Sequence, residues 1–185
     1  MAQWRPTFNP DSLYFVTTKA VLYAHLFQSN VIARLLVDYL DCLRARKQIE
    51  LYAFVIMPNH IHFIIRCLLP HTLADVVRNY KSTIADRLIR HYETIGDVGA
   101  LDHLAMSIKP DQKRSYQIWE EGYNAKEVFS PDFLIQKMNY IHNNPCQPHW
   151  HLVEKPEDYV WSSARFYLLG KPAIIPLDNV EVLIT

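Results

Sequence analysis

Two histidines near the middle of the chain have the spacing of a metal-binding pair. His60 and His62 lie in the stretch Leu51–Arg66, which reads LYAFVIMPNHIHFIIR. Apolar runs rich in β-branched and aromatic residues flank Pro58 and Asn59, a pair that favours a turn, so the stretch predicts a β-hairpin. The two predicted strands are Leu51–Met57 and His60–Arg66.

The alternation of side chains along a strand gives the two faces of this hairpin different roles. His60 and His62 point to one face, with their Cα atoms roughly 7 Å apart, whereas Ile61, Phe63 and Ile65 point to the other face and can be buried. Two imidazoles at that spacing can bind one divalent cation, each through one ring nitrogen. Without a third ligand, the same pair can simply be hydrogen-bonded histidines on a half-exposed sheet.

A helix later in the chain carries residues that could complete such a site. Ser130 is a suitable N-cap, Pro131 suits the first helical position, and the helix must end before Pro145. Tyr140 and Asn144 are four residues apart, so they share one side of this helix. The apolar residues Leu134, Met138 and Ile141 lie on another side and are expected to pack.

The chemistry of this set depends on whether the helix lies across the histidine face of the sheet. There, the amide oxygen of Asn144 could join His60 and His62 as a third metal ligand. Tyr140, one turn away, would face whatever the metal holds. A phenol is a weak nucleophile at neutral pH, so it needs a polarised electrophile, which a phosphodiester on a divalent cation provides. Attack would give a covalent phosphotyrosine that retains the bond energy, so that strand joining needs no nucleotide cofactor.

The remaining periodicities predict the elements that must position these residues. A strand, a helix, the hairpin, a second helix and a short strand follow in the order β-α-β-β-α-β, which predicts an α+β, ferredoxin-like split βαβ fold, with the tyrosine-bearing helix added to its antiparallel sheet. Outside the hairpin these elements are Leu13–Lys19, about Asn30 to Lys47, roughly Leu73 to His91, and Gln117–Glu120. The stretch Tyr92–Tyr116 predicts either a short helix around Leu101–Ile108 or a mobile loop. Ser162 or Ser163 can cap a short helix that ends near Gly170, and Val180–Ile184 predicts an edge strand.

Length and composition favour one cytoplasmic domain. The 185 residues, half of them hydrophobic, suffice for a single core, so we expect one catalytic domain over 1–185 with a C-terminal extension from about residue 145. No apolar run approaches the roughly 18 residues needed to span a bilayer, and the N-terminus lacks the apolar core of a signal peptide. The three cysteines are odd in number and form no C-x-x-C pair, which is typical of reduced thiols in the cytoplasm.

Net charge gives no support for a nucleic-acid partner, because lysine plus arginine and aspartate plus glutamate both number 19. Local basic clusters are the remaining electrostatic indication, although such clusters are more often solvated faces than binding sites. From their position off the buried helical stripe or in a loop, we predict that Lys81, Lys109, Lys113 and Arg114 contact DNA phosphates.

Four separated motifs resemble those of a known family, in the family's order. MPNHIHF at Met57–Phe63 resembles the HUH motif of the single-tyrosine insertion-sequence transposases. YIHNNP at Tyr140–Pro145 resembles the tyrosine helix of the branch called REP-associated tyrosine transposases. WEEGY at Trp119–Tyr123 and EKPEDYVWSS at Glu154–Ser163 are similar to further segments of that branch. The likeness extends from about Leu13 to Gly170, whereas CQPHWH after Pro145 departs from the family's usual continuation.

The resemblance implies a complete reaction. In that family a ferredoxin-like sheet acts on single-stranded or hairpin DNA with Mg²⁺ or Mn²⁺, and the matching positions imply Tyr140 as nucleophile with His60, His62 and Asn144 as metal ligands. The expected activity is DNA cleavage and joining through a 5′-phosphotyrosine, by a monomer or a homodimer and with no membrane partner. Two alternatives remain: a metal-dependent phosphoesterase without a covalent intermediate, and a non-catalytic regulator that binds hairpin DNA.

Overall fold

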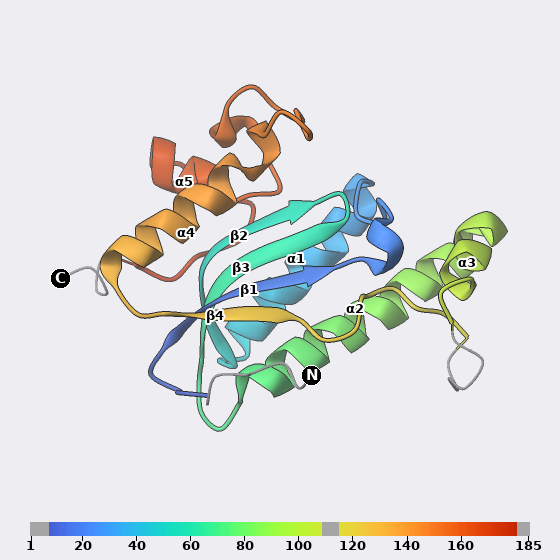
Figure 1. The fold of residues 1–185 in the computed structure, drawn as a ribbon, viewed down its shortest axis with the longest axis horizontal. Coiled ribbons are helices and arrows are strands. Elements are labelled where there is room, and N and C mark those ends of the chain that lie inside the picture. Colours follow the sequence, from blue (N-terminus) through green and yellow to red (C-terminus); the bar gives the residue numbers. More distant parts are fainter. Residues whose placement is uncertain (1–7, 109–114, 181–185) are drawn as a thin grey trace.

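A four-stranded antiparallel sheet with the strand order β2-β3-β1-β4 organises the chain (Figure 1). The computed structural model describes residues 8–108 and 115–180. The strands are β1 (Leu13–Lys19), β2 (Ile49–Met57), β3 (His60–Cys67) and β4 (Asn124–Val128). The helices are α1 (Asn30–Ala45), α2 (Leu73–Ile95), α3 (Val98–Ala105), α4 (Pro131–Asn143) and α5 (Ala164–Leu169), and short 3₁₀ turns occur at Val21–Tyr23 (η1), Asn144–Cys146 (η2) and Pro156–Asp158 (η3). This is the predicted ferredoxin-like arrangement, with α4 added to the sheet.

One face of the sheet carries the main hydrophobic core. Ile61, Phe63 and Ile65 of β3 are buried there against α1 and α2, as their alternation predicts (Figure 1). The long helix α2 begins at Thr72, whose hydroxyl accepts from the amide of Asp75 at 3.2 Å. Such a cap satisfies one of the amide groups that a helix leaves unpaired at its start.

The opposite face is covered by α4, which packs on a smaller apolar cluster that includes Phe15, Val55 and Met138. The predicted N-cap is confirmed, because the Ser130 hydroxyl accepts from the Phe133 amide at 3.2 Å. A proline at the first position has no amide to satisfy and a pre-set φ, so the sequence fixes where this helix begins.

The prediction of a strand at Gln117–Glu120 is wrong. Within that stretch only Trp119 forms an isolated bridge, to Ala20, and its ring is buried in the core. The chain then turns at Gly122, whose φ is +70°, and the fourth strand follows at Asn124–Val128. This edge strand is half exposed and polar at alternate positions, so it lacks the apolar signal that identifies the other strands. The short helix expected around Leu101–Ile108 is α3, three residues earlier, and the edge strand expected at Val180–Ile184 lies almost wholly outside the described residues.

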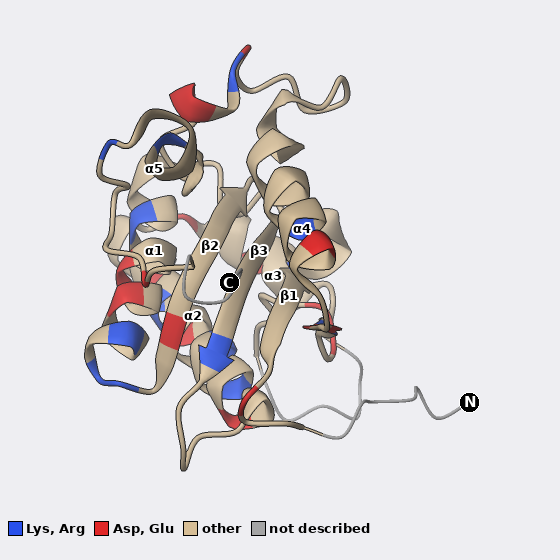
Figure 2. Cartoon of the chain, turned by 90° about the vertical axis from the view of Figure 1, so that its left-hand side faces the viewer, with Lys and Arg blue, Asp and Glu red and all other residues tan. Residues whose placement is uncertain are grey.

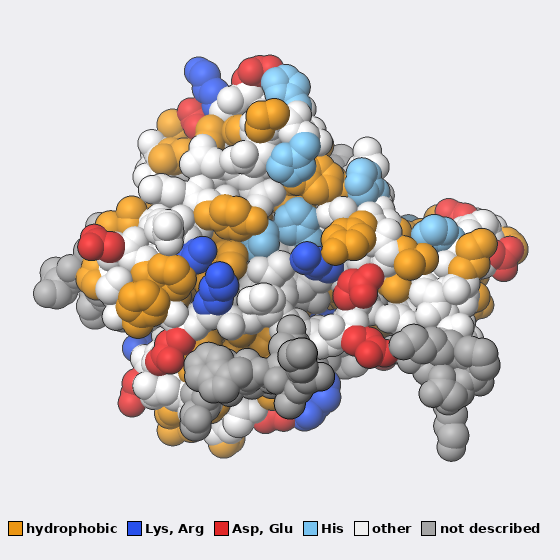
Figure 3. All heavy atoms as spheres, viewed as in Figure 1, with side chains coloured by type: hydrophobic (Ala, Val, Ile, Leu, Met, Phe, Trp, Pro, Cys, Tyr) orange, Lys and Arg blue, Asp and Glu red, His pale blue; other side chains and the backbone are white. Residues whose placement is uncertain are grey.

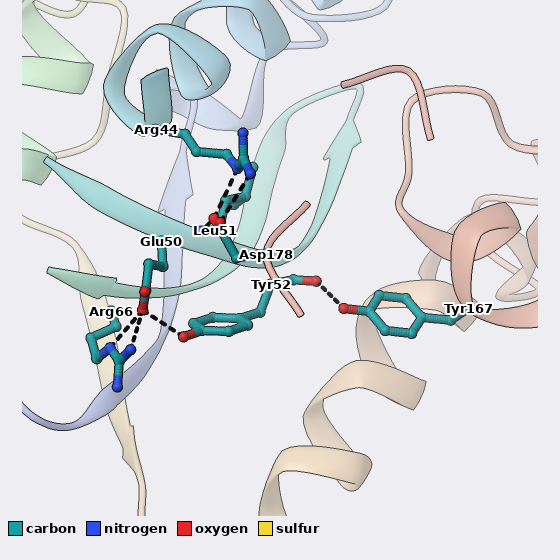
Figure 4. A network of polar contacts seen from close by, with 7 residues as sticks. All are labelled: Arg44, Glu50, Leu51, Tyr52, Arg66, Tyr167 and Asp178. Atoms are coloured by element: carbon teal, nitrogen blue, oxygen red, sulfur yellow. Dashed lines mark hydrogen bonds and ion pairs between the residues drawn. The ribbon is translucent and has the colours of Figure 1, made fainter. Parts of the chain in front are cut away.

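The segment after α4 covers the edge formed by β2. Figure 4 shows Asp178 held by both arms of the Arg44 guanidinium, at 2.8 and 2.9 Å, while its carboxylate also accepts from the Leu51 amide at 2.8 Å. The Tyr167 hydroxyl donates to the carbonyl of Tyr52 at 2.5 Å. These bonds occupy backbone groups that an open sheet edge would leave exposed to pairing with other chains.

Charges of both signs are interspersed over the surface, as expected for a chain with no net charge (Figure 2). The three cysteines are free thiols. Across residues 8–108 and 115–180, we find no helix whose length and apolar character would suit it to crossing a membrane.

Candidate active site

The predicted histidine pair lies at the floor of a pocket on the α4 face of the sheet. The rings of His60 and His62 are 4.8 Å apart between centroids, and His62 is only 4% exposed. The pocket has a volume of about 230 Å³. Its lining residues are Lys19, Tyr23, Asn59, His60, His62, Tyr140, His149 and Trp150. Residues from η1, the hairpin, α4 and the following segment therefore converge on one site.

The turn of the hairpin fixes the orientation of the His60 ring. Asn59 donates its amide hydrogen to the carbonyl of Tyr23 at 3.2 Å, which turns its side-chain oxygen toward His60. That oxygen lies 2.7 Å from His60 Nδ1 and can only accept, so Nδ1 carries the proton. Nε2 of His60 is then left with a lone pair, the form in which an imidazole binds a metal.

A threonine on the neighbouring strand holds the ring of His62 in place. Thr17 lies directly opposite His62 in the pairing of β1 with β3, and its hydroxyl is 2.8 Å from Nδ1. The other nitrogen, Nε2, is buried and has no hydrogen-bond partner among the described residues. A buried polar nitrogen without a partner is costly in a core and typical of a site that binds something.

The electrostatics of the pocket keep both imidazoles neutral. Burial lowers the pKa of His60 to about 4, helped by the positive charge of Lys19 and by His149. The pKa of His62 is also lowered well below its usual value, first by burial and then by the charges of His60, Lys19 and Lys137. A neutral imidazole is the species that coordinates a metal, so no proton has to be displaced near pH 7.

Asn144, the helix-borne ligand predicted from the sequence, is buried beside the pocket and is not among the residues that line it. It is the first residue of η2, directly after α4, and is only 5% exposed. The Asn144 side chain raises the pKa of His60 slightly, against the stronger effect of burial, so it lies close to the His60 ring and remains a candidate third ligand. Within residues 8–108 and 115–180, no three His, Cys, Asp or Glu side chains form a group that could hold a metal ion.

Tyr140 stands beside the histidines on the wall of the same pocket. Its ring lies 5.1 Å from that of His62 in an edge-to-face arrangement and 6.0 Å from that of Phe15. The side chain is 49% exposed, so the phenol is accessible to a substrate. All of these residues come from a single chain.

The predicted DNA contacts are less well defined. Lys109, Lys113 and Arg114 lie outside the described residues. Lys81 lies on α2, and its ammonium group donates to the carbonyls of Glu120, at 2.8 Å, and of Gly122. Helix α2 packs on the face of the sheet opposite the histidines, and Lys81 is not among the residues that line their pocket. Its contact with DNA remains a prediction.

Sequence reasoning missed the residues that orient and surround the histidines. Thr17 and Asn59 fix the rings, Lys19 lines the pocket, and Lys137 stands over the Tyr140 ring at 5.7 Å from its centroid. Asn59 could have been found from the sequence, because it is adjacent to His60. Predicting the role of Thr17 would have required the register between β1 and β3, which no local pattern gives.

Comparison with known structures shows which fold the chain shares. The solved structure of a REP-associated tyrosine transposase bound to a REP hairpin is similar over 97% of this chain and 93% of that one, with a TM-score of 0.61 and 17% identity. That likeness shows that the two proteins share a fold. A putative transposase from Deinococcus radiodurans is also similar, with a TM-score of 0.45 and 22% identity over 77% of this chain and 97% of that one.

The sequence itself gives the family. The family model described as "Transposase IS200 like" matches residues 22–144, more than half of the chain and a stretch that contains both histidines and Tyr140. The chain therefore belongs to the IS200-like transposases, as its motifs predict. No curated protein matches it in sequence.

Proposed function

We propose that the protein is a metal-dependent endonuclease and strand transferase for single-stranded DNA that works through a 5′-phosphotyrosine on Tyr140. One observation carries this proposal: the buried, unpartnered Nε2 of His62 lies in the same pocket as the exposed phenol of Tyr140, with the two rings 5.1 Å apart. This arrangement supports the proposal, because a metal ligand and a nucleophile in one pocket can act on the same phosphate.

The residues present suit a divalent cation such as Mg²⁺ or Mn²⁺. His60 and His62 would hold it through Nε2 and Asn144 through its amide oxygen, with Asn59 and Thr17 fixing the two rings from behind. When bound, the cation supplies Lewis-acid polarisation of the scissile phosphate and offsets the charge of the transition state.

The chain's own residues perform the covalent step. The Tyr140 oxygen forms a bond to phosphorus as the bond from phosphorus to the 3′-oxygen breaks. The phenol proton passes to water, and the departing 3′-oxygen takes a proton from water to become a 3′-hydroxyl. In the reverse step a 3′-hydroxyl attacks the same phosphorus and Tyr140 leaves. The number of phosphoester bonds is unchanged in either direction, so the reaction needs no energy source. Lys19 lines the pocket and adds positive charge where the phosphate must bind.

The DNA partner follows from the site and from the family. The structural neighbour is a transposase bound to a REP hairpin, and we propose that this chain also takes single-stranded DNA that includes a hairpin. A phenol at the wall of a small pocket requires a strand that can bend into it, which an unpaired strand does more readily than a duplex.

The test is a covalent adduct. We would incubate the protein with Mn²⁺ and a library of oligonucleotides in which randomised single strands flank a fixed hairpin, and then denature it. A label at the 3′ end is expected to stay with the protein and a label at the 5′ end to be released. Tyr140→Phe should form no adduct, whereas Tyr23→Phe, an exposed tyrosine of the same pocket, should retain it.

Each contrary result would indicate a different activity or a different polarity of cleavage. Cleavage without an adduct, unaffected by Tyr140→Phe, would establish a phosphoesterase in which water attacks. Binding without cleavage would establish a regulator of hairpin DNA. A 5′ label that stays with the protein would reverse the proposed polarity.

A further inference from the structure

A row of aromatic and basic side chains extends along α4 away from the pocket. Phe129, Phe133, Lys137 and Tyr140 are spaced four, four and three residues apart, which places them on one side of the helix and the turn before it. We call these four residues the α4 stripe. Figure 3 shows this face, where hydrophobic side chains gather beside lysine or arginine side chains next to the central histidines.

The outer end of the α4 stripe is an aromatic pair, in which Phe129 is exposed and Phe133 is half-buried. The rings of Phe129 and Phe133 are stacked, with centroids 4.8 Å apart and planes at 17°. Phe129 is 78% exposed, although a ring of that size gains about 2 kcal/mol by leaving water. Stacked aromatic rings that remain open to solvent form a flat surface on which further planar groups can stack.

Two lysines lie between this pair and the pocket. The ammonium group of Lys137 is 5.0 Å from the Phe133 ring, 5.2 Å from the Phe15 ring and 5.7 Å from the Tyr140 ring. Lys126 on β4 lies opposite Phe15 in the strand register, so its side chain is on the same face. Both lysines thus adjoin Phe15, and the pKa of Lys137 is lowered by burial and then by the charge of Lys126.

Acidic side chains near these lysines point elsewhere. Glu127 follows Lys126 on β4, so the alternation of the strand turns it to the other face, where its carboxylate accepts from the Ser12 hydroxyl at 2.5 Å. Asp132 adjoins Phe133 but lies about 100° around the helix from it. The α4 stripe therefore presents aromatic rings and positive charge together.

We propose that the α4 stripe binds the single strand that continues from the cleavage site, with bases stacked on Phe129 and Phe133 and phosphates against Lys137 and Lys126. This inference rests on the proposed function and names the form of its substrate. Rings interleaved with lysines suit unpaired DNA, because every base has a face to stack and every nucleotide carries a negative charge. A duplex offers no free base faces along its length.

The stripe is also continuous with the reacting group, since Tyr140 is its inner end. From Tyr140 back to Phe133 the helix rises roughly 10 Å, and the Phe129 ring lies a further 4.8 Å from that of Phe133, so the row matches about four nucleotides stacked at 3.4 Å. The strand would thus be held over several nucleotides before the scissile phosphate reaches the pocket. Such positioning contributes to catalysis by aligning the phosphate with the phenol.

Binding of unstructured oligonucleotides tests the proposal. We would measure the affinity for dT4, dT8 and dT12 by fluorescence anisotropy in the Tyr140→Phe background, which cannot form an adduct. Affinity should rise from dT4 to dT8, and Phe133→Ala should weaken dT8 binding by at least about tenfold, with a smaller loss for Phe129→Ala. Phe166→Ala on α5, which also removes an exposed ring, is the matched control and should have no effect.

The salt dependence provides the second measurement. Lys137→Gln and Lys126→Gln should each reduce the slope of log affinity against log salt by about 0.7, the value for one phosphate of a single strand. Lys155→Gln, next to η3, should leave the slope unchanged. Equal affinities and slopes for all stripe variants would overturn the proposal.

Failure of this inference and failure of the proposed function look different. If the stripe variants bind normally while the protein with an intact Tyr140 still forms its adduct, only the stripe is refuted. If the stripe binds oligonucleotides as expected but no adduct forms with Mn²⁺, the proposed reaction is refuted and the stripe stands as a binding surface for single strands.

Discussion

The two faces of the sheet divide stability from chemistry. On one face, Ile61, Phe63 and Ile65 are almost fully buried against two long helices. On the other face, His60 and His62 alternate with them along the same strand and line a pocket under one shorter helix. A strand with a period of two can therefore anchor the fold with one set of side chains while the other set remains free for function. We therefore expect a substitution on the core face of β3 to lower stability and a substitution at the adjacent position, on the pocket face, to lower activity.

The largest effects should come from substituting two adjacent residues of β3 that point to opposite faces of the sheet. We expect His62→Ala to abolish adduct formation while leaving most of the stability, because it removes a ligand from a face that contributes little to the main core. Phe63→Ala should cost about 3–5 kcal/mol of unfolding free energy, since it leaves a cavity in that core. Urea unfolding and the adduct assay measure the two quantities.

If Phe63→Ala does not fold, Phe63→Leu serves in its place, with a smaller loss of stability and an adduct rate near that of the unsubstituted protein. The division between the faces would be refuted if Phe63→Leu lost the reaction while remaining folded, or if His62→Ala retained it.

The second prediction concerns whether the two halves of the site must come from one chain. Tyr140 lies beside the histidines of its own chain, so a mixture of His62→Ala and Tyr140→Phe proteins should form no adduct. Exchange of the tyrosine helix between subunits would instead restore a substantial part of the activity in the mixture. Gel filtration of the same samples would show whether a homodimer is present.

The third prediction compares adjacent threonines of β1 on opposite faces. Thr17 holds Nδ1 of His62, so Thr17→Val should weaken binding of Mn²⁺ by about 10–100-fold, as measured by titration calorimetry. The hydroxyl of Thr18 is buried on the other face with no hydrogen-bond partner among the described residues. Thr18→Val should therefore leave Mn²⁺ affinity unchanged and keep or raise the stability. Equal effects of the two substitutions on Mn²⁺ affinity would show that Thr17 does not position the ring.

The elements that local patterns specify were predictable from the sequence. The hairpin, α1, α2 and α4 each have an apolar period and a turn or cap, and they occur where those signals place them. The same patterns indicated which face of β3 carries His60 and His62. Edge strand β4 was misplaced because its exposed, polar sequence resembles a loop and its pairing with β1 is not local.

The finer parts of the site depend on contacts between distant segments. The orientation of Asn59 is set by the carbonyl of Tyr23, which lies in a turn where Tyr23 has a φ of +53°. The stacking of Lys137 over Phe15 requires α4 to be docked on β1. Neither contact corresponds to a pattern in the sequence, so only the folded chain shows how the candidate ligands and the tyrosine are held.

The smallest expected effect tests a histidine of α4 that faces the protein instead of the pocket. His142 is buried, its Nε2 lies 2.9 Å from the Ser163 hydroxyl, and burial lowers its pKa to about 4. Between about pH 6.5 and 4 the unfolded chain binds a proton at this position that the folded chain does not, so stability falls as the pH falls through that range.

His142 should account for about 2 kcal/mol of the stability lost between pH 7.5 and pH 5. His142→Gln, which can still hydrogen-bond to Ser163, should show a smaller loss by about that amount in urea unfolding at the two pH values, while His103→Gln on α3 serves as a control. An unchanged pH dependence in His142→Gln would mean that His142 binds its proton equally well in the folded and the unfolded chain. Burial under α4 would then not disfavour the charged imidazole, and the underside of the helix would no longer resemble the pocket in keeping its histidine neutral.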